Sequence, residues 1–232
     1  MDTLVQNAGK KQERQINRRT VVIWSSMVAA SAISFGVDVP GLGLREAFAE
    51  TGVVDLGAGD IGVLNYAYAL EQLEAAYYTQ VLKTPYKDIA KAELAILRDI
   101  QGHEVAHRDF FRKALGGKRI PDLKPNFKSV DFSSRDSVLM TASTFEDLGV
   151  SAYNGGGAAI KNPDYLAAAG TIVSIEARHA AVLRDLLKPL STSFGGDDVV
   201  DASGLDVARK PSEVLSIAAP FIDTPITAKQ LP

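Results

Sequence analysis

The sequence predicts an all-α protein, a four-helix bundle with one long crossover between the second and third helices. Three observations predict this fold. Apolar residues recur at three- and four-residue steps in four segments, short joins connect the first two and the last two segments, and a 19-residue irregular stretch separates the pairs. The chain has 232 residues, of which 46% are apolar and 23% charged, a composition that argues against wholesale disorder.

The first helix pair is expected between residues 60 and 115. One apolar stripe spans residues 60–81 and ends before Thr84-Pro85, and a longer one spans residues 86–115, where two glycines follow. Because the join between the stripes is short, these two helices should pack as an antiparallel hairpin.

The second helix pair is expected between residues 133 and 188. Ser133 and Ser134 are both good N-caps for the third helix, whose far end is left open because the glycines at 155–157 weaken a helix. Asn162-Pro163 is typical of an N-cap followed by proline in the first turn, and it predicts the start of the fourth helix. A short helix is expected at residues 212–219.

The stretch 116–134 is too long for a tight turn. At about 3.3 Å per residue it can span roughly 60 Å, whereas a helix of about 28 residues is roughly 42 Å long. It can therefore cross the length of the bundle, which we place at residues 60–190, followed by a tail at 191–232. Two independent helical hairpins are the alternative, but each would bury little apolar surface by itself.

Residues 1–49 are expected to be a signal peptide. A basic start precedes an uncharged run at residues 20–37, and Ala47-Phe48-Ala49 fits a small-x-small cleavage site, with cleavage after Ala49. An uncleaved membrane anchor is the alternative. However, the run is shorter than the roughly 20 strongly apolar residues that span a bilayer, and four serines dilute it.

The pair Arg18-Arg19 before this run resembles a twin-arginine export signal. The chain departs from the usual pattern by Asn17 before the pair and Val21-Val22 after it. The resemblance implies the twin-arginine export machinery as a partner and a periplasmic or secreted protein, with no stable membrane span after cleavage.

Charge and composition narrow the chemistry. The formal charge is −3, and residues 50–232 carry 19 Lys or Arg against 24 Asp or Glu, so no nucleic acid partner is expected. The absence of Cys excludes disulfides, thiolate metal sites, Fe–S clusters and cysteine nucleophiles. Any metal must bind oxygen and imidazole, and the histidines are His103, His107 and His179. A monomer and a homodimer are both compatible with this surface charge.

Two Glu-x-x-His motifs carry the candidate chemistry. Glu104 with His107, and Glu176 with His179, each project from one helix face, which is the apolar face. Buried carboxylates are rare unless they are paired or bound to a metal. Taken alone, either motif is more often a solvated pair, and His103 is expected to be a surface residue or a neighbour of a ligand.

The two halves of the chain repeat these features. Glu71 and Glu146 lie on the inner stripes of the first and third helices, and each is seven residues before a tyrosine, Tyr78 or Tyr153, which we expect in the core. Five of the eight Glu after position 49 fall on inner stripes. Four carboxylates and two imidazoles around a pseudo-twofold centre suit iron or manganese better than zinc or magnesium.

The stretches LEQLEAAYY and FEDLGVSAYNGG, together with the two motifs, resemble the ferritin-like superfamily and in particular its exported, desiccation-related ferritin-like proteins. The resemblance covers roughly residues 60–190 and the tail around PSEVLSIAAPFI. It implies two Fe or Mn ions bridged by Glu104 and Glu176. The terminal ligands that it implies are Glu71, His107, Glu146 and His179. Glu71 is preferred to Glu74 because its spacing to Tyr78 matches that of Glu146 to Tyr153.

Two functions are compatible with such a site. The first is iron oxidation or the handling of O2 or peroxide at a carboxylate-bridged dinuclear centre, in stress protection outside the cytoplasm, with manganese-catalase-like activity as a variant. The alternative is a non-enzymatic stress- or desiccation-related envelope protein whose metal site is structural or vestigial. The sequence assigns no catalytic residue.

Overall fold

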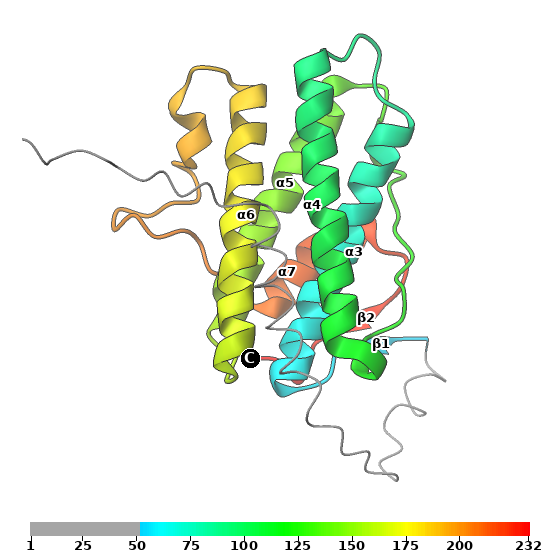
Figure 1. Cartoon of the computed structure of the whole chain (residues 1–232), viewed down its shortest axis with the longest axis vertical. Helices are drawn as coiled ribbons and strands as arrows, with labels where there is room; N and C mark the ends of the chain where they lie inside the picture. The colour runs from blue at the N-terminus through cyan, green and yellow to red at the C-terminus, as the bar shows by residue number, and fades with distance from the viewer. Residues whose placement is uncertain (1–51) are drawn as a thin grey trace, which may run out of the picture. The chain divides into compact units, whose positions relative to one another are not determined.

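The computed structural model describes residues 52–232, so the predicted signal peptide and its cleavage after Ala49 lie outside the described residues. Four long helices dominate the described part of the chain (Figure 1). They are α3 (Gly59–Lys83), α4 (Lys91–Leu115), α5 (Arg135–Gly157) and α6 (Pro163–Leu187). The all-α fold class and the four-helix bundle are therefore confirmed.

The helix boundaries agree with the sequence except at the start of α4. This helix begins at Lys91 rather than near residue 86, because Asp88 has a φ of +60°, which interrupts a right-handed helix. The Tyr86 side chain is buried, and its hydroxyl donates a hydrogen bond to Glu93 in the first turn of α4. Tyr86 therefore belongs to a packed loop before α4 and not to the helix itself.

Both caps of the second pair lie where the sequence predicts them. The Ser134 hydroxyl accepts a hydrogen bond from the backbone N–H of Ser137, and Asn162 caps α6 ahead of Pro163. The α5 helix continues through its three glycines to Gly157.

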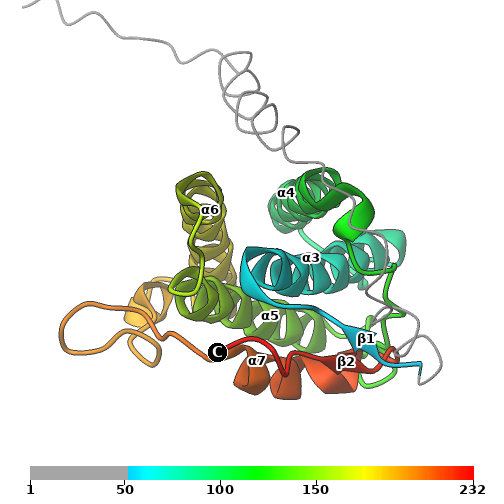
Figure 2. The same cartoon turned by 90° about the horizontal axis from the view of Figure 1, so that it is seen from below.

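Contacts at the helix ends establish the directions of the helices. Arg135 at the start of α5 pairs with Glu93 in the first turn of α4, with Nη2 2.6 Å from Oε2, so α4 and α5 run parallel. Asp60 at the start of α3 accepts hydrogen bonds from the backbone N–H groups of Lys161 and Asn162, just before α6 (2.8 and 3.0 Å). Because short joins at 84–90 and 158–162 connect helices that pack on each other, each hairpin is antiparallel. The two hairpins meet where α3 packs on α5 (Figure 2).

Residues 116–134 form the predicted crossover and run along α3. Near the start of α3, the Asn65 side chain accepts a hydrogen bond from the backbone N–H of Ile120 (2.9 Å). Nearer its end, the ring of Tyr77 packs edge-on against Phe127, with ring centroids 5.5 Å apart. With α4, α5 and the crossover around it, α3 is buried on nearly every face.

The C-terminal residues pack against the same central helices. The short helix α7 (Pro211–Ala218) lies against α5, and strand β2 (Ile226–Thr227) pairs in parallel with β1 (Val54–Asp55) just before α3 (Figure 2). Among the described helices, α6 alone is long and apolar enough to cross a membrane. Core helices of globular proteins often have the same length and composition, so this is weak evidence for a membrane span.

A close approach between the tail and α5 gives a test of this packing. A Cβ at Gly155 would lie 1.9 Å from the carbonyl oxygen of Arg209, a contact that requires the backbone to move. We expect Gly155→Ala to lower the free energy of unfolding by about 1–3 kcal/mol, the usual cost of overpacking. Urea unfolding of the purified protein measures this change.

The matched control is Gly170→Ala on the exposed face of α6, where a Cβ would meet no atom within 4 Å. This variant should be more stable by about 0.5–1 kcal/mol, since alanine favours a helix more than glycine does. Equal effects of the two substitutions would contradict the close approach of the tail.

Candidate metal centre

Seven ionisable side chains from all four long helices meet in the middle of the bundle. Every one of the five carboxylates is at most 4% exposed. The seven residues are Glu71 and Glu74 from α3, Glu104 and His107 from α4, Glu146 from α5, and Glu176 and His179 from α6. The structure thus brings together all six residues that the sequence singled out as candidate ligands, and both motifs face the interior rather than water.

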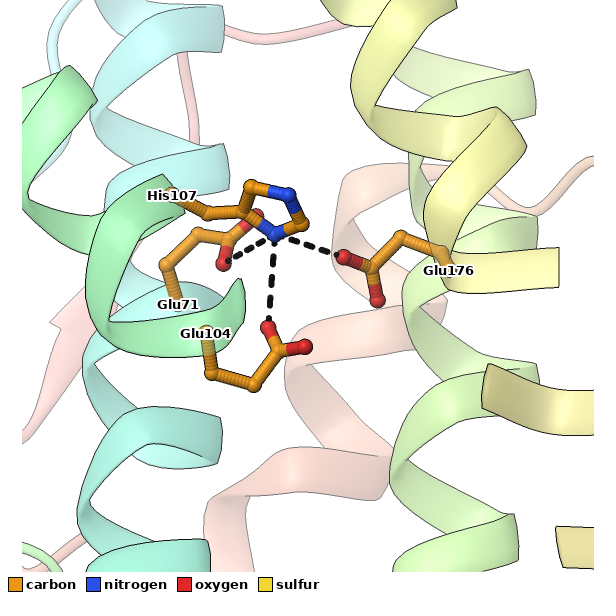
Figure 3. A group of neighbouring side chains, drawn as sticks. All are labelled: Glu71, Glu104, His107 and Glu176. Atoms are coloured by element: carbon orange, nitrogen blue, oxygen red, sulfur yellow. Dashed lines mark ion pairs between the residues drawn. The ribbon is translucent and has the colours of Figure 1, made fainter. Parts of the chain in front are cut away.

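The first group of ligand atoms comes from Glu71, Glu104, His107 and Glu176 (Figure 3). The Nδ1 atom of His107 lies 3.0 Å from Glu176 Oε1, and 3.5 Å from one oxygen each of Glu71 and Glu104. One ligand atom from each residue lies within 4.8 Å of the others. This group could hold a metal ion.

The second group consists of Glu104, Glu146, Glu176 and His179, with the same mutual spacing. The Nδ1 atom of His179 lies 2.9 Å from Glu104 Oε1 and 3.2 Å from Glu146 Oε2. Glu104 and Glu176 belong to both groups. These two carboxylates therefore lie where ligands shared by two ions would have to lie.

Several atoms of the first group are buried without a partner in hydrogen-bonding geometry. They are Oε2 of Glu71, both carboxylate oxygens of Glu104 and of Glu176, and Nδ1 of His107. A buried polar atom without a hydrogen bond costs about 1–3 kcal/mol, and a charged one costs more. A cation between these atoms would satisfy them, and their oxygen-rich set with imidazole fits iron or manganese. The residues therefore fit a bound metal.

Two tyrosines hold the carboxylates across the interface between the helix pairs. The hydroxyl of Tyr78 on α3 donates a hydrogen bond to Glu146 on α5 (2.6 Å), and the hydroxyl of Tyr153 on α5 donates one to Glu71 on α3. The Tyr78 ring lies in the core, as expected, whereas the Tyr153 ring is partly buried and packs against the core. The hydrogen bonds make both hydroxyls part of the site. The equal seven-residue spacing from Glu to Tyr in the two halves was the sequence signal for this role.

Glu74 belongs to neither group of ligand atoms. A Cβ atom at Gly149 would lie 3.1 Å from Oε1 of Glu74 and 3.3 Å from Oε2 of Glu176. Glycine at this position therefore makes room for a fifth carboxylate beside the two groups. Of the two glutamates on α3, the structure places Glu71 against His107.

Burial raises the pKa of most of these carboxyls. It brings the pKa of Glu71 to about 7, although the contact with His107 opposes the rise. Burial and then the negative charge of Glu176 raise the pKa of Glu74 well above its ordinary value. Burial and then the charge of Glu104 do the same for Glu176. Burial therefore favours the protonated forms of Glu71, Glu74 and Glu176.

The histidines hold positive charge close to Glu104. Burial alone would lower the pKa of both rings, but contacts with Glu104 and Glu176 raise that of His107. Contacts with Glu104 and Glu146 raise the pKa of His179 to about 9. Burial would raise the pKa of Glu104, but hydrogen bonds and charge from the two histidine rings lower it to about 2. Protons thus occupy the region between the carboxylates, and a metal ion has to displace them.

Residues 59–189 match the family model described as a ferritin-like domain. The match covers more than half of the chain and includes both groups of ligand atoms. Among proteins with curated functions, none matches the chain.

The proton on Glu71 makes metal binding depend on pH. Because its pKa is about 7 in the metal-free protein, this carboxyl is mostly protonated at pH 6 and mostly ionised at pH 8. Mn²⁺ affinity should therefore be at least about tenfold higher at pH 8 than at pH 6. Calorimetric titration at the two pH values measures the difference.

Glu71→Gln is the control for this dependence, because glutamine has a similar shape and cannot ionise. It should bind Mn²⁺ more weakly at both pH values and show a smaller increase between them. An affinity of the wild type that does not change with pH would contradict the assigned proton.

Proposed function

We propose that this chain, which belongs to the ferritin-like domain family, binds two iron or manganese ions and reacts with dioxygen or peroxide. The observation that carries this proposal is the sharing of Glu104 and Glu176 by two groups of buried ligand atoms. Two shared carboxylates with one further Glu and one His on each side match the ligand pattern of dinuclear carboxylate proteins with this fold.

The bound ions would supply the electron transfer that reduces dioxygen or peroxide. The chain supplies the positions of the ligands. The hydroxyls of Tyr78 and Tyr153 restrict the rotation of Glu146 and Glu71, each of which keeps a second oxygen directed towards a histidine. Since all five carboxylates are buried, interactions with charged groups inside the centre are stronger than they would be in water.

We further propose that the protein works outside the cytoplasm, as a periplasmic or secreted protein in stress protection. The basic start, the apolar run at residues 20–37 and Ala47-Phe48-Ala49 support export. The twin-arginine pair supports a route that carries folded proteins, which suits a centre whose metal is loaded before export.

Metal content tests the dinuclear centre. After reconstitution with Fe²⁺ or Mn²⁺, the purified protein should hold close to two ions per chain by elemental analysis. The double variant Glu104→Gln with Glu176→Gln should lose both ions, because each residue belongs to both groups. Asp109→Asn, at an exposed acidic residue of the same helix α4, should keep them.

A wild-type protein that binds no transition metal would refute this proposal. If the two ions bind but the protein consumes neither dioxygen nor peroxide, the site is structural and the non-enzymatic alternative holds. Thermal unfolding adds an independent measure, because a metal at 100–1,000 times its Kd stabilises the native state by roughly 3–4 kcal/mol.

Export has its own test. The double variant Arg18→Lys with Arg19→Lys should remain in the cytoplasm, while Arg14→Lys should be exported normally. Mass spectrometry of the exported protein should show a chain that starts at Glu50. That chain has no tryptophan, because the single Trp of the sequence is Trp24. An exported protein that retains Trp24 would contradict cleavage after Ala49.

A further inference from the structure

We propose that His103 is a positioning residue for one metal position and that the two positions are consequently unequal. His103 precedes Glu104 on α4, belongs to neither group of ligand atoms and is exposed. Its Nδ1 lies 2.9 Å from Nε2 of His179 on α6. The two rings are nearly parallel, with an interplanar angle of 8° and centroids 5.1 Å apart.

Both ring nitrogens of His179 are therefore engaged. Nδ1 faces Glu104 and Glu146, and Nε2 faces His103. A neutral histidine that offers Nδ1 to a metal carries its proton on Nε2. That N–H then donates to Nδ1 of His103, whose own proton must lie on its Nε2. Once His179 is neutral, the contact selects the tautomer that leaves Nδ1 without a proton, and it holds the ring with Nδ1 directed between Glu104 and Glu146.

Among residues 52–232, His107 has no such partner. The sequence reads HEVAH at residues 103–107 and IEARH at residues 175–179, so the repeat counterpart of His103 is Ile175. An isoleucine side chain has no atom that accepts a hydrogen bond. The tyrosine hydrogen bonds are present in both halves, whereas the histidine pair occurs once. The two Nδ1 atoms differ as well: that of His107 has no partner in hydrogen-bonding geometry, although Glu176 Oε1 lies 3.0 Å away, while that of His179 contacts Glu146.

The inequality has a direct consequence for metal binding, and to that extent it rests on the proposed function. The position formed with His179 has a ring that is oriented before the ion arrives, so it fills first. Loss of the partner of a metal-bound histidine typically lowers metal affinity by about 10- to 100-fold. Only this position should lose affinity when His103 is replaced, because the hydrogen bond of His103 goes to His179 and not to His107.

The experiment compares the wild type with His103→Phe and His103→Gln. Phenylalanine keeps a ring but accepts no hydrogen bond, whereas the glutamine carbonyl oxygen can accept one from Nε2–H of His179. In Zn²⁺ titrations, we expect two binding steps in the wild type. In His103→Phe, the tighter step should weaken about 10- to 100-fold while the other changes little, and His103→Gln should restore much of the loss.

A second measurement needs no metal. In ¹⁵N-edited NMR spectra of the metal-free protein, the Nε2–H of His179 should give a ring signal, assigned by its disappearance in His179→Gln. This signal should be lost in His103→Phe and retained in His103→Gln. Persistence of the signal in His103→Phe would overturn the proposed hydrogen bond.

The outcomes separate this inference from the proposed function. If the wild type binds no Zn²⁺, Fe²⁺ or Mn²⁺, both the dinuclear centre and the inequality fail, and the NMR measurement still decides the contact between the histidines. If two ions bind but His103→Phe weakens both steps equally, or neither, the dinuclear centre stands and the positioning role is overturned. A His103→Gln variant that behaves like His103→Phe also overturns it.

Discussion

The burial of charge at the centre of the bundle is the constraint on which the rest of the described structure depends. Five carboxylates lie between four helices with at most 4% of their surface exposed. Ionised carboxylates in such surroundings require compensation by protons, by histidines or by a cation. The two groups that share Glu104 and Glu176 concentrate this requirement within a few ångströms. Each helix therefore has to present its polar residues at one level of the bundle.

The hydrogen bonds that hold the candidate ligands also join the two halves. The α3–α4 and α5–α6 hairpins are continuous in sequence only through residues 116–134. Across their interface, Tyr78 reaches Glu146 and Tyr153 reaches Glu71. Removal of either hydroxyl would leave a buried carboxylate with one contact fewer, so the geometry of the centre and the packing of the hairpins depend on the same residues.

Small residues allow the close approaches that this arrangement needs. Gly149 leaves space beside Glu74 and Glu176, and Gly155 allows the backbone at Arg209 to lie against α5. The tail in turn packs α7 on α5 and adds β2 beside β1, close to the start of α3. The tail therefore supports α3 and α5 on the side opposite to α4 and α6 (Figure 2).

Local sequence patterns were enough to predict the four helices, the crossover and the six residues that meet at the centre, because helical periodicity and Glu-x-x-His spacing need no knowledge of the tertiary structure. They placed the start of α4 too early, since the left-handed backbone at Asp88 has no apolar signature. The tertiary structure places Glu71, the preferred residue of the two on α3, against His107, and it alone reveals that His103 reaches His179. The contact of His103 with His179 joins the two hairpins, so it depends on how far one hairpin is rotated and shifted along the other. Periodicity within a helix carries no information about that displacement.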